Sequence, residues 1–303
     1  MKTPWWFLYK TPLAFLLLPV SFFYYLISRC VFAFRKIHPY KSRRKIVCVG
    51  GLLAGGVGKT PIVRQIAKVF DAPVVMRGYK KTAKTGNVGD EAMMLSMDDI
   101  IVHVGNRKSN IVLLNKQQED TPIIMDDGLQ NPSIKKDISI YVFDEGLGFG
   151  NGFLLPAGPL RETKKHILNA DAIIVIRNKN PRKKFALPTG VPIFYAENKT
   201  LSPYPRGEKL FAFAGIGYPK KFFNSLSGVV AKRGFGDHYQ YTEKDIADLI
   251  ESARRKKAKL VATEKDWVRL PVDVREKIKF AKLETKIDER FFDWLKGKLN
   301  CAH

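Results

Sequence analysis

Short apolar runs recur along the chain and alternate with stretches whose apolar residues follow helical spacing. Runs of four to seven residues rich in β-branched side chains are typical of buried strands, and the stretches between them favour helices. This alternation predicts an α/β fold with a parallel sheet and helices on both of its faces. The runs are residues 45–49, 73–76, 100–104, 121–127, 138–143 and 172–176.

The pattern changes near residue 190. Residues 194–205 are polar and contain prolines, so we expect an extended linker over residues 191–206. Beyond it, the apolar pattern predicts a second, smaller α/β lobe over residues 207–303. Its expected elements are strands at 210–214 and 259–262, a helix from residue 219, and helices at 243–256 and 288–299.

The most apolar part of the chain lies near the N-terminus. Residues 11–28 carry no charge, and a helix of this length rises roughly 27 Å, close to the thickness of a hydrocarbon core. We therefore expect residues 1–34 to form an N-terminal membrane anchor helix. Pro19 would kink a spanning helix, so a helix half-inserted at the interface remains open, as does a helix buried in the core.

Positive charge follows this segment at once. The formal net charge is +23, and six Lys and Arg residues lie within residues 35–45, whereas the first acidic residue is Asp71. Cations placed where a helix would leave a bilayer fit an anionic membrane surface and favour a cytoplasmic position for the remaining chain. No motif of aromatic and basic residues accompanies the charge, so we expect no nucleic-acid partner.

Composition narrows the class further. Hydrophobic residues make up 45% of the chain, which excludes a disordered protein. Cys30, Cys48 and Cys301 are widely spaced and form no C-x-x-C pair, which indicates a reducing compartment and no zinc site.

A glycine-rich loop, GGLLAGGVGKT over residues 50–60, follows the first predicted strand and precedes a helical pattern. Strand, glycine loop and helix in this order are the context of a Walker A loop, in which backbone N–H groups wrap phosphate oxygens. Lys59 would reach the β- and γ-phosphates, and the Thr60 hydroxyl would hold Mg²⁺. Leu53 occupies the first glycine position of the strict motif. The expected nucleotide-binding residues are Gly55, Gly56, Val57, Gly58, Lys59 and Thr60.

An apolar run over residues 121–127 ends in Asp126 and Asp127, as a Walker B strand does. Adjacent carboxylates repel each other unless a cation or hydrogen bonds balance them. We therefore expect both to lie at a Mg²⁺ site, although an acidic turn before Gly128 would give the same pattern.

Residues 55–61 resemble the deviant Walker A loop of ParA/MinD-like ATPases. That family carries a signature lysine where this chain has Ala54. A membrane-associated ATPase of this kind stays open as the alternative function.

Further motifs resemble those of the tetraacyldisaccharide 4′-kinase family and follow the family's order. The most specific of these motifs is the run from Gly148 to Glu162. One departure is Asn131, which follows the matching segment over residues 126–130, because the family usually has His there. The other matching segments are Arg77-Gly78-Tyr79, Val88-Gly89-Asp90-Glu91, residues 126–130, residues 212–217, Phe235-Gly236-Asp237-His238 and Thr263-Glu264-Lys265-Asp266.

The resemblance implies ATP- and Mg²⁺-dependent phosphorylation of the 4′-hydroxyl of tetraacyldisaccharide 1-phosphate, which gives lipid IV-A in lipid A biosynthesis. It implies a lipid disaccharide substrate and a place at the cytoplasmic face of a bacterial inner membrane, with no obligate protein partner. An anionic lipid substrate would also account for the apolar segment and the basic residues.

By match to the family's motifs, Asp90 would be the catalytic base, and His238 beside Asp237 would orient or tune it. Asp90 falls within residues 35–190, the expected P-loop kinase domain, whereas His238 falls on the second lobe. From the residues alone, a helix N-cap is an equal alternative for Asp90, and an ordinary surface histidine is the favoured interpretation of His238. The remaining expected roles are Glu162 for Mg²⁺, and Arg77, Tyr79 and Arg161 for substrate.

Overall fold

The computed structural model describes residues 4–78, 89–178, 181 and 186–300. This part of the chain folds into two compact units. The larger unit takes the described residues of 4–78, 98–197 and 285–300, and the smaller unit takes residues 89–97 and 198–284. The sequence predicts continuous lobes, whereas residues 89–97 belong here to the smaller unit. The chain also passes between the units inside two long strands, β7 (Ile193–Leu201) and β11 (Lys279–Ile287).

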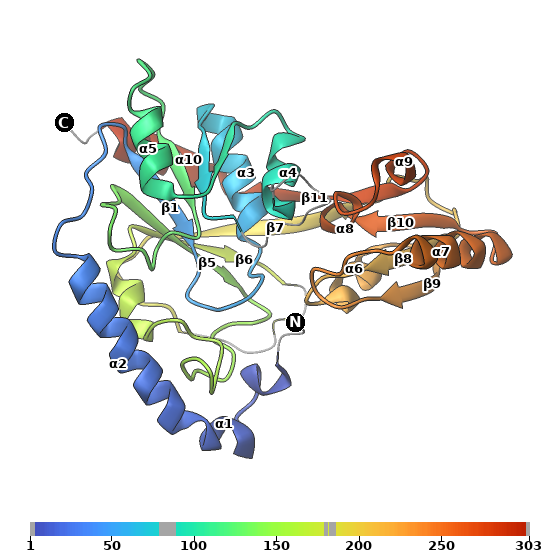
Figure 1. Cartoon of the computed structure of the whole chain (residues 1–303), viewed down its shortest axis with the longest axis horizontal. Coiled ribbons are helices and arrows are strands. Elements are labelled where there is room, and N and C mark those ends of the chain that lie inside the picture. The colour runs from blue at the N-terminus through green and yellow to red at the C-terminus, as the bar shows by residue number, and fades with distance from the viewer. Residues whose placement is uncertain (1–3, 79–88, 179–180, 182–185, 301–303) are drawn as a thin grey trace. The chain divides into compact units, whose positions relative to one another are not determined.

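A parallel sheet forms the centre of the larger unit, as the alternating pattern predicts (Figure 1). Strand β1 pairs on one side with β4 and on the other with β5, so the glycine loop leaves the middle of the sheet. In sheet order the strands are β3 (Val102–Val104), β2 (Val74–Met76), β4 (Ile123–Asp126), β1 (Ile46–Gly50), β5 (Ile138–Asp144), β6 (Ala172–Ile176) and β7.

Helices cover this sheet because their apolar residues pack against its apolar side chains and bury them. Helix α3 (Lys59–Phe70) packs on β1 and β4, and α5 (Arg107–Leu114) packs on β2 and β3. Ile111 and Leu114 of α5 share a core cluster with Ile46 and Cys48 of β1. The last helix, α10 (Glu289–Asn300), packs through Phe291 on Phe194 of β7, with ring centroids 5.4 Å apart.

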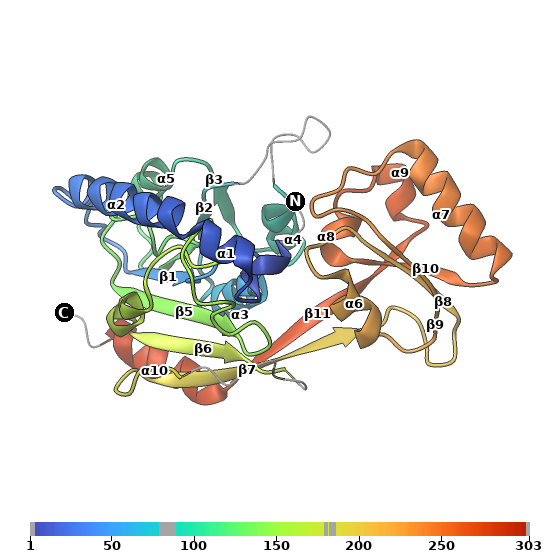
Figure 2. The ribbon, with the colours of Figure 1, turned by 90° about the horizontal axis from the view of Figure 1, so that it is seen from below.

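The N-terminal segment packs on the larger unit. A short 3₁₀ helix, η1 (Trp5–Phe7), precedes α1 (Pro12–Leu16) and α2 (Leu18–Arg35), and Figure 2 shows α1 and α2 end to end. The buried Asn151 amide donates a hydrogen bond of 2.8 Å to the carbonyl of Trp6, and Ser21 donates one of 3.0 Å to the carbonyl of Leu154. These contacts tie the segment to the loop over residues 150–161.

The prediction of an N-terminal membrane anchor helix over residues 1–34 is wrong, because this stretch forms three separate helices. The helix is interrupted at Leu17, and Pro19, which has no N–H to donate, stands in the first turn of α2. Helix α2 continues past Arg29 to Arg35. Among the described residues, no helix combines the length and the apolar character that crossing a membrane requires.

A second parallel sheet forms the smaller unit, with the strand order β11, β10 (Lys259–Thr263), β8 (Leu210–Ala214) and β9 (Val229–Gly234). Helix α7 (Glu243–Arg255) packs on β10, and α4 (Asp90–Ser96) packs on α8 (Glu264–Trp267). The short helices α6 (Pro219–Ser225) and α9 (Val272–Arg275) complete the unit.

The stretch that the sequence predicts as a linker contains strand β7. Its residues alternate, with Phe194 and Ala196 buried and Tyr195 and Glu197 facing outward, so the strand has few apolar residues in a row. A prediction based on continuous apolar runs therefore assigns such a half-buried strand to a polar segment.

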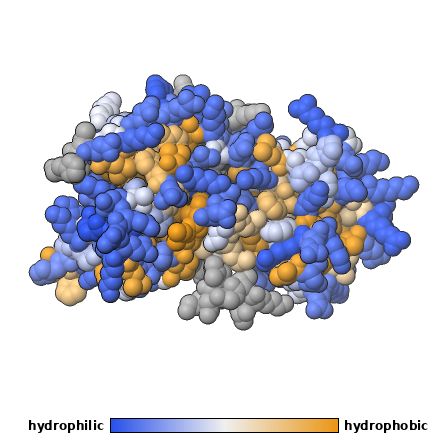
Figure 3. All heavy atoms as spheres, turned by 90° about the horizontal axis from the view of Figure 1, so that it is seen from above, coloured by the Kyte–Doolittle hydropathy of each residue, from blue (hydrophilic) through white to orange (hydrophobic). Residues whose placement is uncertain are grey.

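The chain is rich in charged residues, which make up 27% of it. The chain has 52 Lys and Arg residues against 29 Asp and Glu residues. Figure 3 shows hydrophilic side chains over most of the face in view, with apolar side chains in smaller groups between them.

Candidate active site

The glycine loop turns the chain from β1 into the first turn of α3. Gly58 precedes α3 with φ of 80°, a left-handed conformation that disfavours residues with a Cβ atom. Gly50 lies so close to Leu129 that an added Cβ atom would come within 2.6 Å of its side chain. The loop thereby places Lys59 and Thr60 at the N-terminus of a twelve-residue helix, where N–H groups and the helix dipole favour phosphate.

Lys59 points at the acid pair that ends β4. Its ammonium lies 2.7 Å from Oδ1 of Asp127, and both oxygens of Asp127 also accept hydrogen bonds of 2.9 Å from Nη1 of Arg161. Burial alone would raise the pKa of the Asp127 carboxyl, but Lys59 and Arg161 outweigh burial and hold the pKa below its ordinary value. Asp127 is therefore ionised and held between two cations.

Backbone pairing brings Arg161 to this position. Ala54 donates a hydrogen bond of 2.7 Å to the carbonyl of Pro159, and Arg161 donates one of 2.8 Å to the carbonyl of Leu52. The most specific motif in the sequence therefore runs along the Walker A loop. Gln130 links the two segments further, since its amide donates to the carbonyl of Gly51 at 3.1 Å and to Glu162 at 3.4 Å.

Two further cations bind backbone carbonyl oxygens of the acid pair and of the loop that follows it. The sequence motifs do not identify either cation. Nη2 of Arg107 donates to the carbonyl oxygens of Asp126 and Asp127 at 2.8 and 3.1 Å, and Lys136 donates to the carbonyl of Leu129 at 3.2 Å. Neither residue belongs to a recognisable motif, so no sequence pattern identifies them.

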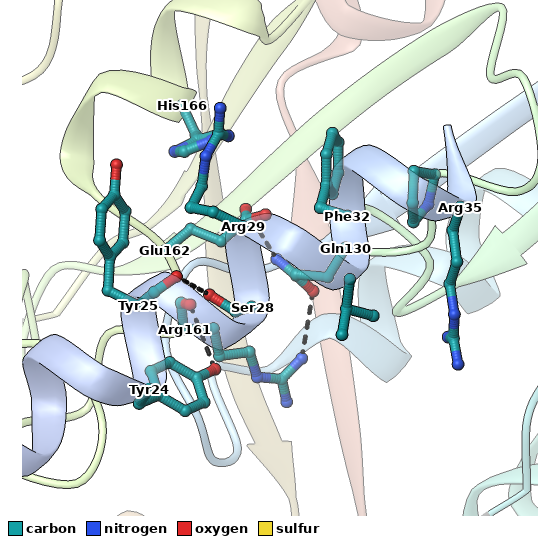
Figure 4. Close-up of a pocket in the computed structure, with 12 residues that line it drawn as sticks. Tyr24, Tyr25, Ser28, Arg29, Phe32, Arg35, Gln130, Arg161, Glu162 and His166 are labelled. Atoms are coloured by element: carbon teal, nitrogen blue, oxygen red, sulfur yellow. Dashed lines mark hydrogen bonds between the residues drawn. The ribbon is translucent and has the colours of Figure 1, made fainter. Parts of the chain in front are cut away.

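A pocket of about 170 Å³ opens beside Arg161, between α2 and the loops of the larger unit (Figure 4). The Tyr24 hydroxyl donates to the carbonyl of Arg161 at 3.3 Å, and Arg29 lies 3.4 Å from Nε2 of His166. Gln130, Arg161 and Glu162 line the pocket from one side, and Tyr24, Tyr25, Ser28, Arg29, Phe32 and Arg35 line it from α2. It combines an apolar wall with three guanidinium groups.

Asp90 and His238 come together within the smaller unit, although they are 148 residues apart. Nδ1 of His238 lies 3.1 Å from Oδ2 of Asp90, and Oδ1 of Asp237 lies 4.0 Å from Nε2 of His238. Asp90 is the first residue of α4 and Gly89 is the N-cap, so Asp90 does not have the capping role that the sequence leaves open. His238 adopts a left-handed conformation with φ of 57°, which is uncommon outside glycine and recurs at functional sites.

The other expected site residues are less defined. Arg77 is exposed just after β2, and Tyr79 lies outside the described residues. Thr60, in the first turn of α3, and Asp126, at the end of β4, supply oxygen donors in the larger unit. Across the described ranges, no group of three or more His, Cys, Asp or Glu side chains is placed to hold a metal ion.

The site defines a P-loop nucleotide-binding protein of the α/β class. Its glycine loop joins a strand to a helix, and the lysine of this loop contacts an acid pair at the end of the neighbouring strand. The family model described as tetraacyldisaccharide-1-P 4′-kinase matches residues 13–300. The chain belongs to this tetraacyldisaccharide-1-phosphate 4′-kinase family, as the sequence motifs predict.

Individual relatives agree with this assignment. Proteins named tetraacyldisaccharide 4′-kinase from Maricaulis maris and Rhodospirillum rubrum are each 36% identical to it, over 80% of this chain and 79% and 82% of their own lengths. A crystal structure of the "apo" form of LpxK from Aquifex aeolicus in complex with ATP matches 95% of this chain and 98% of its own, with a TM-score of 0.75. At 24% identity, this likeness shows the shared fold.

Proposed function

We propose that this protein transfers the γ-phosphoryl group of ATP to the 4′-hydroxyl of tetraacyldisaccharide 1-phosphate, which gives lipid IV-A. Membership of the kinase family over residues 13–300 is the observation that carries this proposal. The P-loop geometry supports it, because Lys59 already faces an acid pair from the N-terminus of α3.

In this proposal the loop residues from Gly55 to Thr60 hold the phosphates of ATP. The Lys59 ammonium leaves Asp127 for the β- and γ-phosphates, while Arg161 continues to neutralise Asp127 or turns to a phosphate of the substrate. Phosphoryl transfer depends mainly on such positioning and on neutralising charge, so these two cations supply much of the catalysis.

The oxygen donors fit Mg²⁺, which prefers few protein carboxylates together with phosphate and water. Thr60, Asp126, Asp127 and Glu162 would hold it, and Asp127 becomes available once Lys59 moves to a phosphate. A bound Mg²⁺ would neutralise charge on the β- and γ-phosphate oxygens.

We propose Asp90 as the group that takes the proton of the acceptor hydroxyl. The hydroxyl oxygen forms a bond to the γ-phosphorus, the bond from that phosphorus to the β–γ bridging oxygen breaks, and ADP leaves with the electron pair. His238 holds the Asp90 carboxylate through Nδ1, and Asp237 stands near its other ring nitrogen.

For the lipid substrate we propose the pocket beside α2, with Arg161 as one of its contacts and Arg77 and Tyr79 as further candidates. Its guanidinium groups suit a phosphorylated sugar, and its apolar wall on α2 suits acyl chains.

Transfer of label tests the function directly. The purified protein is incubated with tetraacyldisaccharide 1-phosphate in detergent micelles, Mg²⁺ and ATP labelled in its γ-phosphate. We expect label in a lipid whose mass has increased by one phosphoryl group. ATP hydrolysis without transfer to the lipid would instead favour an ATPase of the ParA/MinD-like kind.

We further propose that α2 lies on the cytoplasmic surface of the bacterial inner membrane, with its apolar face among the lipids. Only Ser21 of α2 is buried, whereas Phe23, Ile27 and Phe34 are 62%, 64% and 77% exposed and share one face by helical spacing. Burying such side chains stabilises binding by about 1.5–3 kcal/mol each. Nearby basic residues such as Arg35 and Lys36 would add attraction to anionic lipids.

Changing Phe23, Ile27 and Phe34 together to Ser should weaken binding to phosphatidylglycerol-containing vesicles at least about tenfold in a sedimentation assay. A matched control changes Val230, Ile250 and Val272, three exposed apolar residues of the smaller unit, to Ser. Equal vesicle binding by the α2 variant and the wild-type protein, at low and high salt, would show that this face is not the membrane contact.

A further inference from the structure

The Asp90 carboxylate has a second hydrogen-bond partner, which neither the motifs nor the proposed function assigns. Nε and Nη2 of Arg269 lie 2.8 and 2.7 Å from Oδ2 of Asp90, the same oxygen that faces His238. Oδ1 of Asp90 has no hydrogen-bond partner among the described residues. The two contacts of the guanidinium fork therefore fix which oxygen of Asp90 is engaged and which is left available.

Arg269 is itself held rigidly. Its side chain is fully buried, and Nη1 donates to the carbonyl of Gly215 at 2.9 Å and to Oδ1 of Asp266 at 3.0 Å. Asp266 is also fully buried and accepts hydrogen bonds from the Gly215 N–H at 2.9 Å and the Tyr241 hydroxyl at 3.0 Å. The guanidinium thus lies between a structural carboxylate and Asp90, with few rotamers open to it.

The same glycine fixes His238. The His238 N–H donates to the carbonyl of Gly215 at 3.1 Å, so Arg269 and His238 are anchored on one backbone oxygen at the end of β8. A Cβ atom at residue 215 would come within 3.0 Å of Asp266 and 3.1 Å of the carbonyl of Gly236. Glycine at this position therefore allows the cluster to close.

The two ring nitrogens of His238 face different partners. A carboxylate only accepts, so Nδ1 of His238 donates to Asp90. Nε2 lies 3.4 Å from Nζ of Lys265 and 4.0 Å from Oδ1 of Asp237. His238 and Arg269 then donate together to one oxygen of Asp90.

We propose that Arg269 is a positioning residue for the reaction: it holds Asp90 through Oδ2 so that Oδ1 is presented, ionised, to the hydroxyl that loses its proton. This inference rests on the proposed function, because it assigns a role toward the proposed base. Arg269 contributes by orienting the Asp90 carboxylate and by balancing its charge, and it needs no contact with the substrate.

The charges around Asp90 agree with this role. Burial alone would raise the pKa of the Asp90 carboxyl, but hydrogen bonds from His238 and Arg269, together with the charges of Arg269 and Lys265, hold the pKa well below its ordinary value. Asp90 is therefore ionised at any pH at which the protein works. Without Arg269, burial is opposed less strongly and the pKa of Asp90 rises.

A pH profile of single-turnover phosphoryl transfer to tetraacyldisaccharide 1-phosphate separates this role from a merely structural one. A base acts only when deprotonated, so activity falls as pH drops through its pKa. In Arg269→Gln, we expect the acidic limb, which lies below the working pH range in the wild-type protein, to move upward into that range and the plateau to fall about tenfold. In Arg269→Lys, which keeps the charge but not the fork, the plateau should fall while the limb stays near that of the wild-type protein.

Arg64→Gln is the matched control, because Arg64 is a buried arginine paired with Asp98 at 2.9 Å in the larger unit. It should change thermal stability without moving the limb. Wild-type limbs and plateaus in folded Arg269→Gln, or in Arg269→Lys if the Gln variant does not fold, would overturn the proposal. So would a loss independent of pH that Arg64→Gln reproduces. If the wild-type protein transfers no phosphate to the lipid, the proposed function fails instead.

Discussion

Changing Lys59 to Ala should lower the rate of phosphoryl transfer by about 10³-fold or more. Its ammonium is the cation that the glycine loop presents from the first residue of α3, where transferred phosphoryl charge has to be balanced. The loop backbone remains in the variant, so nucleotide binding should weaken far less than turnover. Single-turnover kinetics at saturating ATP, beside a nucleotide titration, would measure both effects.

Lys68→Ala provides the control on the same helix. Lys68 also pairs with a carboxylate, Asp98 at 2.6 Å, but lies near the C-terminal end of α3. We expect this variant to retain nearly normal turnover. Undiminished turnover of Lys59→Ala, or an equal loss in Lys68→Ala, would remove Lys59 from the mechanism.

Elements with a strong local pattern could be predicted from the sequence. Strands β1, β4 and β6 are continuous apolar runs, and each lies within two residues of its predicted bounds. Strands β7 and β11 were harder to predict, because they mix buried and exposed residues and are neighbours in the sheet although they lie far apart in the sequence. Long-range pairing leaves no periodic signal in one sequence.

The N-terminal segment shows a different limit of prediction from hydropathy. Its lack of charge predicts a long apolar helix, but hydropathy does not reveal that Ser21 and Trp6 bond to the loop over residues 150–161. These side-chain contacts make the segment part of the larger unit. The apolar face that remains exposed on α2 is the feature that hydropathy does detect.

Those parts of the candidate site that belong to a sequence motif could be predicted. The glycine loop and the acid pair at residues 126–127 are brought together as their motifs indicate, through the contact of Lys59 with Asp127. Arg107 and Arg269 were not predictable, because each acts on a residue that is close only after folding. A positioning arginine is identified by its partners, and a sequence alone does not show them.

The pairing of Asp90 with His238 leads to the second large effect. Asp90→Asn and His238→Ala should each lower kcat by about 10²-fold, in the range expected for lost general-base catalysis. Asn keeps the shape of Asp but cannot take a proton, and Ala at residue 238 removes the Nδ1 contact of 3.1 Å that holds Oδ2. Because two residues that act as one unit are not additive, the double variant should be little worse than the worse single variant.

The competing explanation is that Asp90 serves only to neutralise buried Arg269, whose Nη2 lies 2.7 Å away. Breaking a buried pair costs about 3–5 kcal/mol of stability, which would lower activity through the folded fraction. Thermal melts recorded beside single-turnover rates separate the two, because the catalytic role predicts a slow reaction per folded molecule. Normal turnover per folded molecule in Asp90→Asn would exclude Asp90 as the base, and strictly multiplicative losses in the double variant would show that Asp90 and His238 act independently.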